Sequence, residues 1–164
     1  MSGKFGGREV LIALVLLVSA MSPLRAQEDR YVLQYLKVAG KVALPLDGSG
    51  TLASFTAKDL SQGKTLFENN CKNCHLAGNN VPGGPNLALN TLKGATPPRD
   101  NIMALVQFSR KPVNYKGDKP SICRDIPKNY LSDLQLKKLY AFVLRAADLA
   151  PGWGTIPSGG TVGE

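Results

Sequence analysis

Three residues near the middle of the chain have types and spacing that suit a metal cofactor. Cys71, Cys74 and His75 form the pattern Cys-x-x-Cys-His within the segment ENNCKNCHLAG. Two thiols three positions apart share one helical turn and can add to the two vinyl groups of one haem, while the next imidazole reaches the iron. The pattern therefore predicts one covalent haem c, with thioethers from Cys71 and Cys74 and with His75 as the proximal axial iron ligand.

Two other kinds of site share part of this pattern. A structural zinc ion needs four Cys or His ligands, and the chain has four such residues once Cys123 is counted with the motif. Adjacent Cys and His side chains are nevertheless awkward for a tetrahedral site. A thiol–disulfide centre would follow a strand in a βαβ pattern, which is not visible in this sequence. Haem attachment is the favoured interpretation.

The second axial ligand is harder to assign, because His75 is the single histidine of the chain. A bis-histidine haem within one chain is therefore excluded. Methionine is the next usual ligand, and of the three methionines two lie in the first 21 residues. The third, Met103, falls in a predicted helix where packing in the core is the favoured role. As a ligand it would raise the haem potential.

Cys123, within PSICRDIPKNY, is the favoured distal axial iron ligand. A thiolate donates charge to ferric iron and lowers the potential, and Arg124 would offset that charge if it turned inward. An odd cysteine in an exported protein also fits a buried free thiol or an intermolecular disulfide. Met103, Tyr130 and an open, water-bound iron site remain the alternatives to Cys123 as ligand.

The N-terminal segment, residues 1–26, has the pattern of a cleaved secretory signal peptide. Lys4 and Arg8 precede the apolar run VLIALVLLVSA, and small and polar residues follow up to Ala26. The run is shorter than the roughly 20 residues that span a bilayer, although an uncleaved anchor and cleavage after Ala20 remain alternatives. Export agrees with the motif, because c-type haem is attached on the outer side of an energy-transducing membrane.

The charge of the chain is basic but evenly distributed. The whole sequence carries +8, and removal of residues 1–26 leaves +6. Nucleic-acid-binding arms cluster Lys and Arg, often with aromatic residues between them, so we expect no nucleic-acid partner. A solvated basic surface and electrostatic docking to an acidic protein or an anionic membrane face are both compatible with this distribution.

Three helices and one hairpin are expected to build the domain. Thr56 and Asp59 have the spacing of a capping box at the start of a helix over 56–75. On this helix, Leu60, Phe67 and Cys71 would face the haem. Gly63 would allow another helix to cross closely. Further helices are expected over 97–112 and 129–153. Asp47-Gly48 permits a β-hairpin, and residues 76–98 read as a loop in which a carbonyl near Pro85 would accept the His75 N–H. A capping box formed by Ser132 and Gln135 is expected at the start of the third helix. The residues expected on the buried faces are Ile102, Leu105, Val106 and Ser109 in the second helix, and Leu136, Leu139, Tyr140, Val143 and Ala147 in the third.

These residues resemble the cytochrome c-550 family of cyanobacterial photosystem II, and within it the c-550-like branch. The resemblance covers about Val42 to Trp153 and rests on LPLDGSG, GKTLFENNCKNCH, ATPPRDNI, YKGD, IPKNYLSD and GWG. It implies an all-α, class I-like monohaem cytochrome c with a small N-terminal β-hairpin. It also implies low potential and an extrinsic position on the donor side of photosystem II, peripheral to the lumenal face of the thylakoid membrane. The expected domains are thus 1–26 signal peptide, 27–41 unassigned, 42–153 cytochrome c domain and 154–164 flexible tail.

The sequence departs from the family pattern at two points. The family has a distal histidine a few residues after the YxG loop, whereas here that segment is shorter and Cys123 falls near the place. The family's C-terminal Tyr-Tyr, which contributes to photosystem docking, is replaced by TIPSGGTVGE. The expected function is electron transfer or an extrinsic-subunit role, with photosystem II lumenal subunits or another redox protein as partner and no enzymatic activity. A haem-based sensor or peroxidatic protein with a labile or open distal site is the alternative, and an assembly subunit whose haem only shapes the fold is a third.

Overall fold

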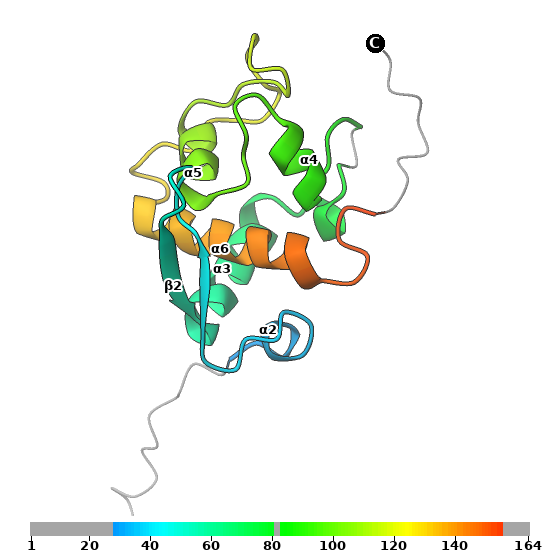
Figure 1. Cartoon of the computed structure of the whole chain (residues 1–164). Coiled ribbons are helices and arrows are strands. Elements are labelled where there is room, and N and C mark those ends of the chain that lie inside the picture. Colours follow the sequence, from blue (N-terminus) through cyan, green and yellow to red (C-terminus); the bar gives the residue numbers. More distant parts are fainter. Residues whose placement is uncertain (1–27, 81–82, 156–164) are drawn as a thin grey trace, which may run out of the picture.

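The computed structural model describes residues 28–80 and 83–155. Figure 1 shows a mainly helical domain with a two-stranded hairpin on one side. The predicted all-α class with a small N-terminal β-hairpin is confirmed. The signal peptide predicted over 1–26 and the tail beyond residue 155 lie outside the described residues. The elements, in chain order, are α2 (Arg30–Gln34), β1 (Lys41–Pro45), β2 (Leu52–Thr56), α3 (Ala57–Asn70), the 3-10 helix η1 (Leu76–Gly78), α4 (Leu89–Gly94), α5 (Ile102–Arg110) and α6 (Asp133–Leu149).

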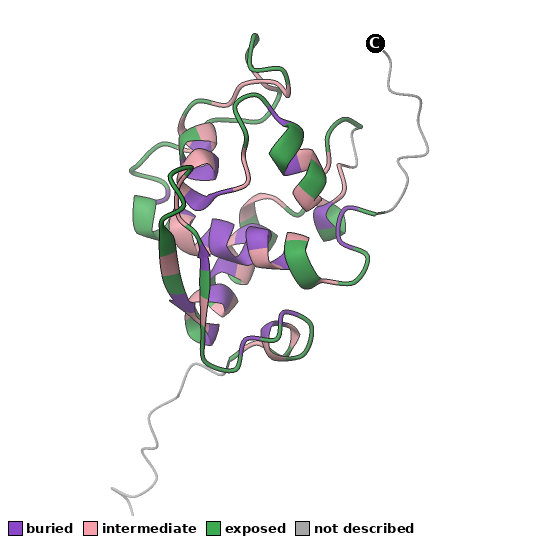
Figure 2. Cartoon of the chain, viewed as in Figure 1, coloured by how far each residue is buried: buried purple, intermediate pink, exposed green. Residues whose placement is uncertain are grey.

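The crossing of α3 and α6 forms the centre of the domain (Figure 1). Both predicted capping boxes are present, Thr56 with Asp59 at the start of α3 and Ser132 with Gln135 at the start of α6. Figure 2 shows buried residues concentrated along α6 and the facing side of α3. Gly63 lies at the crossing, where a Cβ atom would come within 2.0 Å of the backbone oxygen of Lys138. The close approach that the sequence predicted at Gly63 is therefore confirmed.

Replacement of Gly63 by alanine should destabilise the holoprotein by about 1–3 kcal/mol, the usual cost of overpacking a core. The added methyl group meets backbone and not a flexible side chain, so the two helices must separate. Urea unfolding followed by circular dichroism measures this change. Gly48→Ala is the matched control, because a Cβ atom at Gly48 has nothing within 4 Å. Equal stabilities for the two variants would contradict the role of Gly63.

The N-terminal part of the domain packs on the helix pair. β1 and β2 are antiparallel, with Lys41 opposite Thr56 and Pro45 opposite Leu52. The preceding segment, unassigned from sequence, is also part of the core, since Val32 and Leu36 of the α2 region are fully buried. The Leu36 carbonyl accepts a hydrogen bond of 2.9 Å from Nε of Arg145 on α6. The folded domain therefore begins before Val42, the residue at which the sequence analysis predicted its start.

α4 and α5 differ from the helices that the sequence predicted between residues 76 and 112. α5 begins at Ile102 instead of residue 97, because the Asn101 side chain accepts a hydrogen bond from the Ala104 N–H and caps the helix there. The segment expected to be entirely loop contains α4. The predicted face of α5 is buried, and Ser109 on it is hydrogen-bonded to the Tyr140 hydroxyl of α6. This contact fixes α5 against α6.

Within residues 28–80 and 83–155, the chain has no helix with the length and apolar character needed to cross a bilayer.

Candidate functional site

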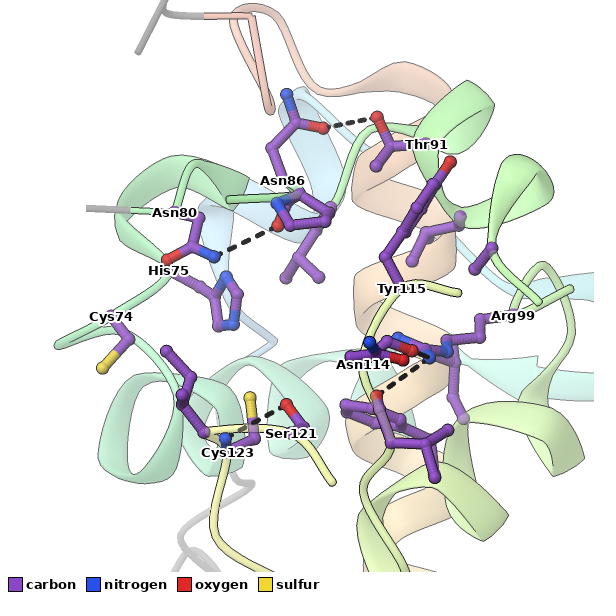
Figure 3. Close-up of a pocket in the computed structure, with 18 of the residues that line it drawn as sticks. Cys74, His75, Asn80, Asn86, Thr91, Arg99, Asn114, Tyr115, Ser121 and Cys123 are labelled. Carbon is purple, nitrogen blue, oxygen red and sulfur yellow. Dashed lines mark hydrogen bonds between the residues drawn. The ribbon is translucent and has the colours of Figure 1, made fainter. Parts of the chain in front are cut away.

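A cavity of about 310 Å³ lies between the end of α3, α4, α5 and the loop that leads to α6. Its volume falls within the usual range for sites that hold a small molecule or cofactor. Figure 3 shows side chains from both halves of the chain pointing toward it. The lining residues include Cys74, His75, Pro85, Asn86, Leu87, Leu92, Arg99, Leu105, Phe108, Tyr115 and Cys123. Two of the three motif residues and the proposed distal ligand therefore meet at one cavity.

The Cys-x-x-Cys-His motif forms the turn that follows α3. The helix ends at Asn70, five residues earlier than predicted, and the His75 N–H donates to the Cys71 carbonyl at 2.8 Å. The Cys71 thiol packs on the hydrophobic core, and its burial, with the Cys123 and Cys74 thiols nearby, raises its pKa to about 12. Cys74 and His75 line the cavity. The turn thus divides the motif between the core and the cavity.

The His75 imidazole has an unpartnered nitrogen in a buried place. Burial lowers the pKa of His75, and the nearby Asn79 backbone opposes that shift. The ring is therefore neutral at pH 7, which is the form that binds metals. Its Nδ1 atom is buried and has no hydrogen-bond partner of good geometry in the described part of the chain. The hydrogen bond expected from His75 to a carbonyl near Pro85 is not formed in the described part of the chain, and the Pro85 carbonyl accepts from Asn80 Nδ2 at 3.3 Å.

The loop after His75 is pinned to the residues that follow α6. Trp153 donates its indole N–H to the Leu87 carbonyl at 3.0 Å, and its ring occupies the place where a side chain at Gly78 would lie. Asn86 donates to the Gly154 carbonyl at 2.6 Å and accepts from the Thr91 hydroxyl at 2.8 Å. The GWG segment therefore fixes the wall of the cavity beside His75. Asn86 and Leu87 both line the cavity.

Two α3 side chains expected at the haem pack elsewhere. Leu60 and Phe67 are buried in the hydrophobic core and do not line the cavity. The Phe67 ring lies 5.6 Å from Phe142 and 5.3 Å from Trp153, centroid to centroid. The prediction assumed that core and cofactor pocket coincide, but α6 and Trp153 cover this face of α3 instead.

Cys123 lies on a loop that is anchored on both sides. Before it, Val113 pairs with Pro120 in an antiparallel bridge around the turn 114–119. After it, the Ile126 N–H donates to the Ser109 carbonyl at 2.7 Å. The Arg110 guanidinium holds the chain beyond, donating to the Ile126 and Leu131 carbonyls. The sulfur of Cys123 faces the cavity in Figure 3.

The alternative distal ligands do not share this position. Met103 and Tyr130 are absent from the described residues that line the cavity, and the Tyr130 hydroxyl donates to Asn70 Oδ1 at 2.8 Å. Arg124, which would offset a thiolate charge only if it turned inward, is exposed and does not line the cavity. Arg99 lines it instead, a residue that no spacing rule singled out. Its position depends on the long-range packing of α4, α5 and the 113–115 segment.

The donor set fits a haem better than a bare metal ion. The described residues contain no group of three or more His, Cys, Asp or Glu side chains that could hold a metal ion. All three cysteines are free thiols, as thioether formation requires. The mostly apolar cavity, the unpartnered imidazole nitrogen and the two motif thiols match the needs of a covalently attached macrocycle with iron at its centre.

Comparisons with known proteins agree with this geometry. The model of the cytochrome c-550 domain matches residues 36–159. The cytochrome c-550-like protein of Thermosynechococcus vestitus is 48% identical over 151 residues, which are 91% of this chain and 86% of that protein. Photosystem II extrinsic protein V of Gloeobacter violaceus is 46% identical over 132 residues, which are 79% of this chain and 71% of that protein.

A solved structure shares both fold and sequence with the chain. The crystal structure of the PsbV2 cytochrome from Thermosynechococcus elongatus superposes with a TM-score of 0.77 at 52% sequence identity. The match covers 78% of this chain and 99% of that one. The resemblance inferred from the sequence motifs is confirmed.

Proposed function

The chain belongs to the cytochrome c-550 family, whose members bind one covalent haem c, and we propose that it is a low-potential monohaem cytochrome. Its relatives include an extrinsic protein of photosystem II. The observation that carries the proposal is the cavity onto which Cys74, His75 and Cys123 all open. This shared cavity supports the proposal that Cys123, from a different part of the chain, is a second, sulfur ligand.

We assign the attachment to the two motif thiols. Cys71 and Cys74 would hold the haem through thioether bonds, each formed by adding sulfur to one vinyl carbon and the thiol hydrogen to the other, with nothing released. His75 supplies the proximal ligand, and its low basicity in the buried position keeps the imidazole neutral and ready to bind. The bound haem supplies one-electron redox chemistry through its iron.

Cys123 is the distal ligand in this proposal. A thiolate donates more charge to ferric iron than a thioether or an imidazole does, so it stabilises the oxidised state and lowers the potential. The anchors at Val113–Pro120 and at Ile126 hold the Cys123 loop, so the sulfur is presented by a fixed piece of chain. Leu92, Leu105 and Phe108 provide apolar walls for the cavity.

The location and partners are proposed from the sequence and the relatives. Residues 1–26 have the pattern of an export signal, and a relative is an extrinsic protein of photosystem II. We therefore propose that the mature protein works at the lumenal face of the thylakoid membrane, in electron transfer or as an extrinsic subunit. Lumenal photosystem II subunits, or another redox protein, are the partners this predicts.

Electron paramagnetic resonance of the oxidised protein, together with an equilibrium redox titration, tests the proposal. We expect a low-spin ferric signal typical of a thiolate ligand and a midpoint potential well below that of His/Met cytochromes, because thiolate stabilises Fe(III). The same sample should not bind carbon monoxide rapidly when reduced or accumulate products with peroxide. A high-spin ferric signal with fast binding of external ligands would instead support the sensor or peroxidatic alternative.

A further inference from the structure

We propose that Arg99 binds a propionate carboxylate of the haem and sets the charge balance of the site. This inference rests on the proposed function, since it presupposes covalent haem in the cavity. It assigns a role to a residue that lies outside the attachment motif and far from it in the sequence.

The Arg99 guanidinium is held rigidly at the cavity wall. Its central carbon lies 4.2 Å from the centroid of the Phe108 ring, a distance typical of cation–π stacking. Its Nη2 atom donates to the carbonyl oxygens of Val113, at 3.0 Å, and Asn114. The Arg99 backbone N–H donates to the Leu92 carbonyl at 2.9 Å. Contacts from three segments thus fix the orientation of a planar, charged group.

The donors on Nε and Nη1 of Arg99 lack acceptors. A guanidinium has five N–H donors in a fixed fork, and within residues 28–80 and 83–155 these two atoms make no hydrogen bond. Arg110 and Arg145, by contrast, are paired with Asp133 and Asp148. Arg99 has no carboxylate partner among the described residues, although it is partly buried and burial lowers its pKa. A partly buried cation without a counter-ion is costly, so its position indicates an anionic ligand.

The charges of the side chains around the cavity indicate the chemical class of that anionic ligand. Among the described lining residues, Arg99 is the single permanently charged side chain, and no Asp, Glu or Lys side chain lines the cavity. A neutral macrocycle would not require a cation here. Haem carries two carboxylates, and the guanidinium fork matches carboxylate geometry through paired hydrogen bonds.

The position of Arg99 agrees with the orientation that the motif imposes. In Figure 3, Cys74 and Arg99 lie on opposite sides of the cavity. The thioether carbons of a haem c belong to two neighbouring pyrrole rings, and the propionates extend from the other two. A macrocycle tethered at Cys74 therefore directs its carboxylates away from the motif. Cys123 also lines the cavity, but in the proposed function its sulfur binds the iron, which leaves the Arg99 guanidinium to the carboxylates.

Arg99→Gln and Arg99→Lys in the holoprotein test the proposal, with Arg124→Gln as the charge-matched control on an exposed residue. Resonance Raman propionate-bending bands should shift in Arg99→Gln and, to a smaller extent, in Arg99→Lys, and stay unchanged in Arg124→Gln. The ratio of oxidised to reduced haem at a fixed potential should rise about tenfold in Arg99→Gln, equal to about 59 mV for one electron. The reason is that an uncompensated carboxylate stabilises Fe(III).

Unshifted propionate bands in both Arg99 variants, in a wild type that carries covalent haem, overturn the inference. A changed ferric spin-resonance signal with unshifted propionate bands also overturns it, because the guanidinium then acts on the axial thiolate. If Arg99→Gln does not fold, the bands of Arg99→Lys alone support or overturn the assignment in the same way. A wild type without covalent haem refutes the proposed function itself, which distinguishes that failure from a failure of the Arg99 assignment.

Discussion

Replacement of both motif cysteines, Cys71→Ser with Cys74→Ser, should abolish covalent haem. Serine hydroxyls do not add to vinyl groups under the conditions in which thiols do, so no thioether bond can form. Any haem that still binds through His75 should be removed by acid–acetone extraction, whereas the wild type keeps its haem in the protein fraction. Haem staining of a denaturing gel and the mass of the polypeptide both measure this difference.

Single variants and Cys123→Ser serve as controls for this result. Cys71→Ser and Cys74→Ser should each retain one thioether and yield less holoprotein, because one bond still prevents extraction. Cys123→Ser should keep both thioethers, since Cys123 lies outside the motif. The assignment is contradicted if haem resists extraction in the double cysteine variant, or if it becomes extractable in Cys123→Ser.

Loss of haem should also cost stability. The cavity is bordered by side chains of the hydrophobic core, among them Leu92 and Leu105. A ligand held only by the folded chain stabilises it by mass action, and a covalent one removes the dependence on concentration. The double cysteine variant should therefore unfold at a lower temperature than the wild type. Because the domain is small, we expect covalent attachment of the haem to contribute to the stability of its core.

Local signals accounted for the parts of the site that lie close together in sequence. The spacing of Cys71, Cys74 and His75 gave the attachment motif, and the capping boxes at Thr56 and Ser132 gave the starts of α3 and α6. These signals work because each depends on residues within one or two turns of the chain. They do not say which face of a helix the cofactor occupies. Phe67 was therefore placed at the haem although Phe142 and Trp153 cover it.

Long-range packing decided the remaining features. The segment that contains α2 is unassigned from the sequence, yet Val32 and Leu36 are buried in the core, and Arg145, more than 100 positions away, donates to the Leu36 carbonyl. Arg99 could not be distinguished from other basic residues until α4, α5 and the 113–115 segment converged around it. Cys123 is predicted as the distal ligand by elimination among ligand types. The structure adds the observation that its loop opens onto the cavity that His75 lines.

Replacement of Cys123 by serine should raise the midpoint potential on the order of 0.1 V or more. The choice of axial ligands moves haem potentials over about 0.8 V, and loss of a thiolate removes the strongest charge donor to ferric iron. The low-spin thiolate signal of the oxidised protein should disappear and give way to a water-bound, high-spin form. Redox titration and electron paramagnetic resonance at the same pH measure the two changes.

The Cys123→Met variant distinguishes the effect of the ligand atom on the haem from the effect of the loop that carries it. A thioether at this position should restore a six-coordinate, low-spin haem at a higher potential than the wild type, because it donates less charge. Met103→Leu and Tyr130→Phe are the matched controls, since neither side chain lines the cavity, and both should leave the spectrum as it is. An unchanged low-spin signal in Cys123→Ser, or a lost one in Met103→Leu, would assign the sixth position to another residue. Because the Cys123 loop is fixed by Arg110 and Ser109, we expect the sulfur, and not a movement of the loop, to account for the change in potential.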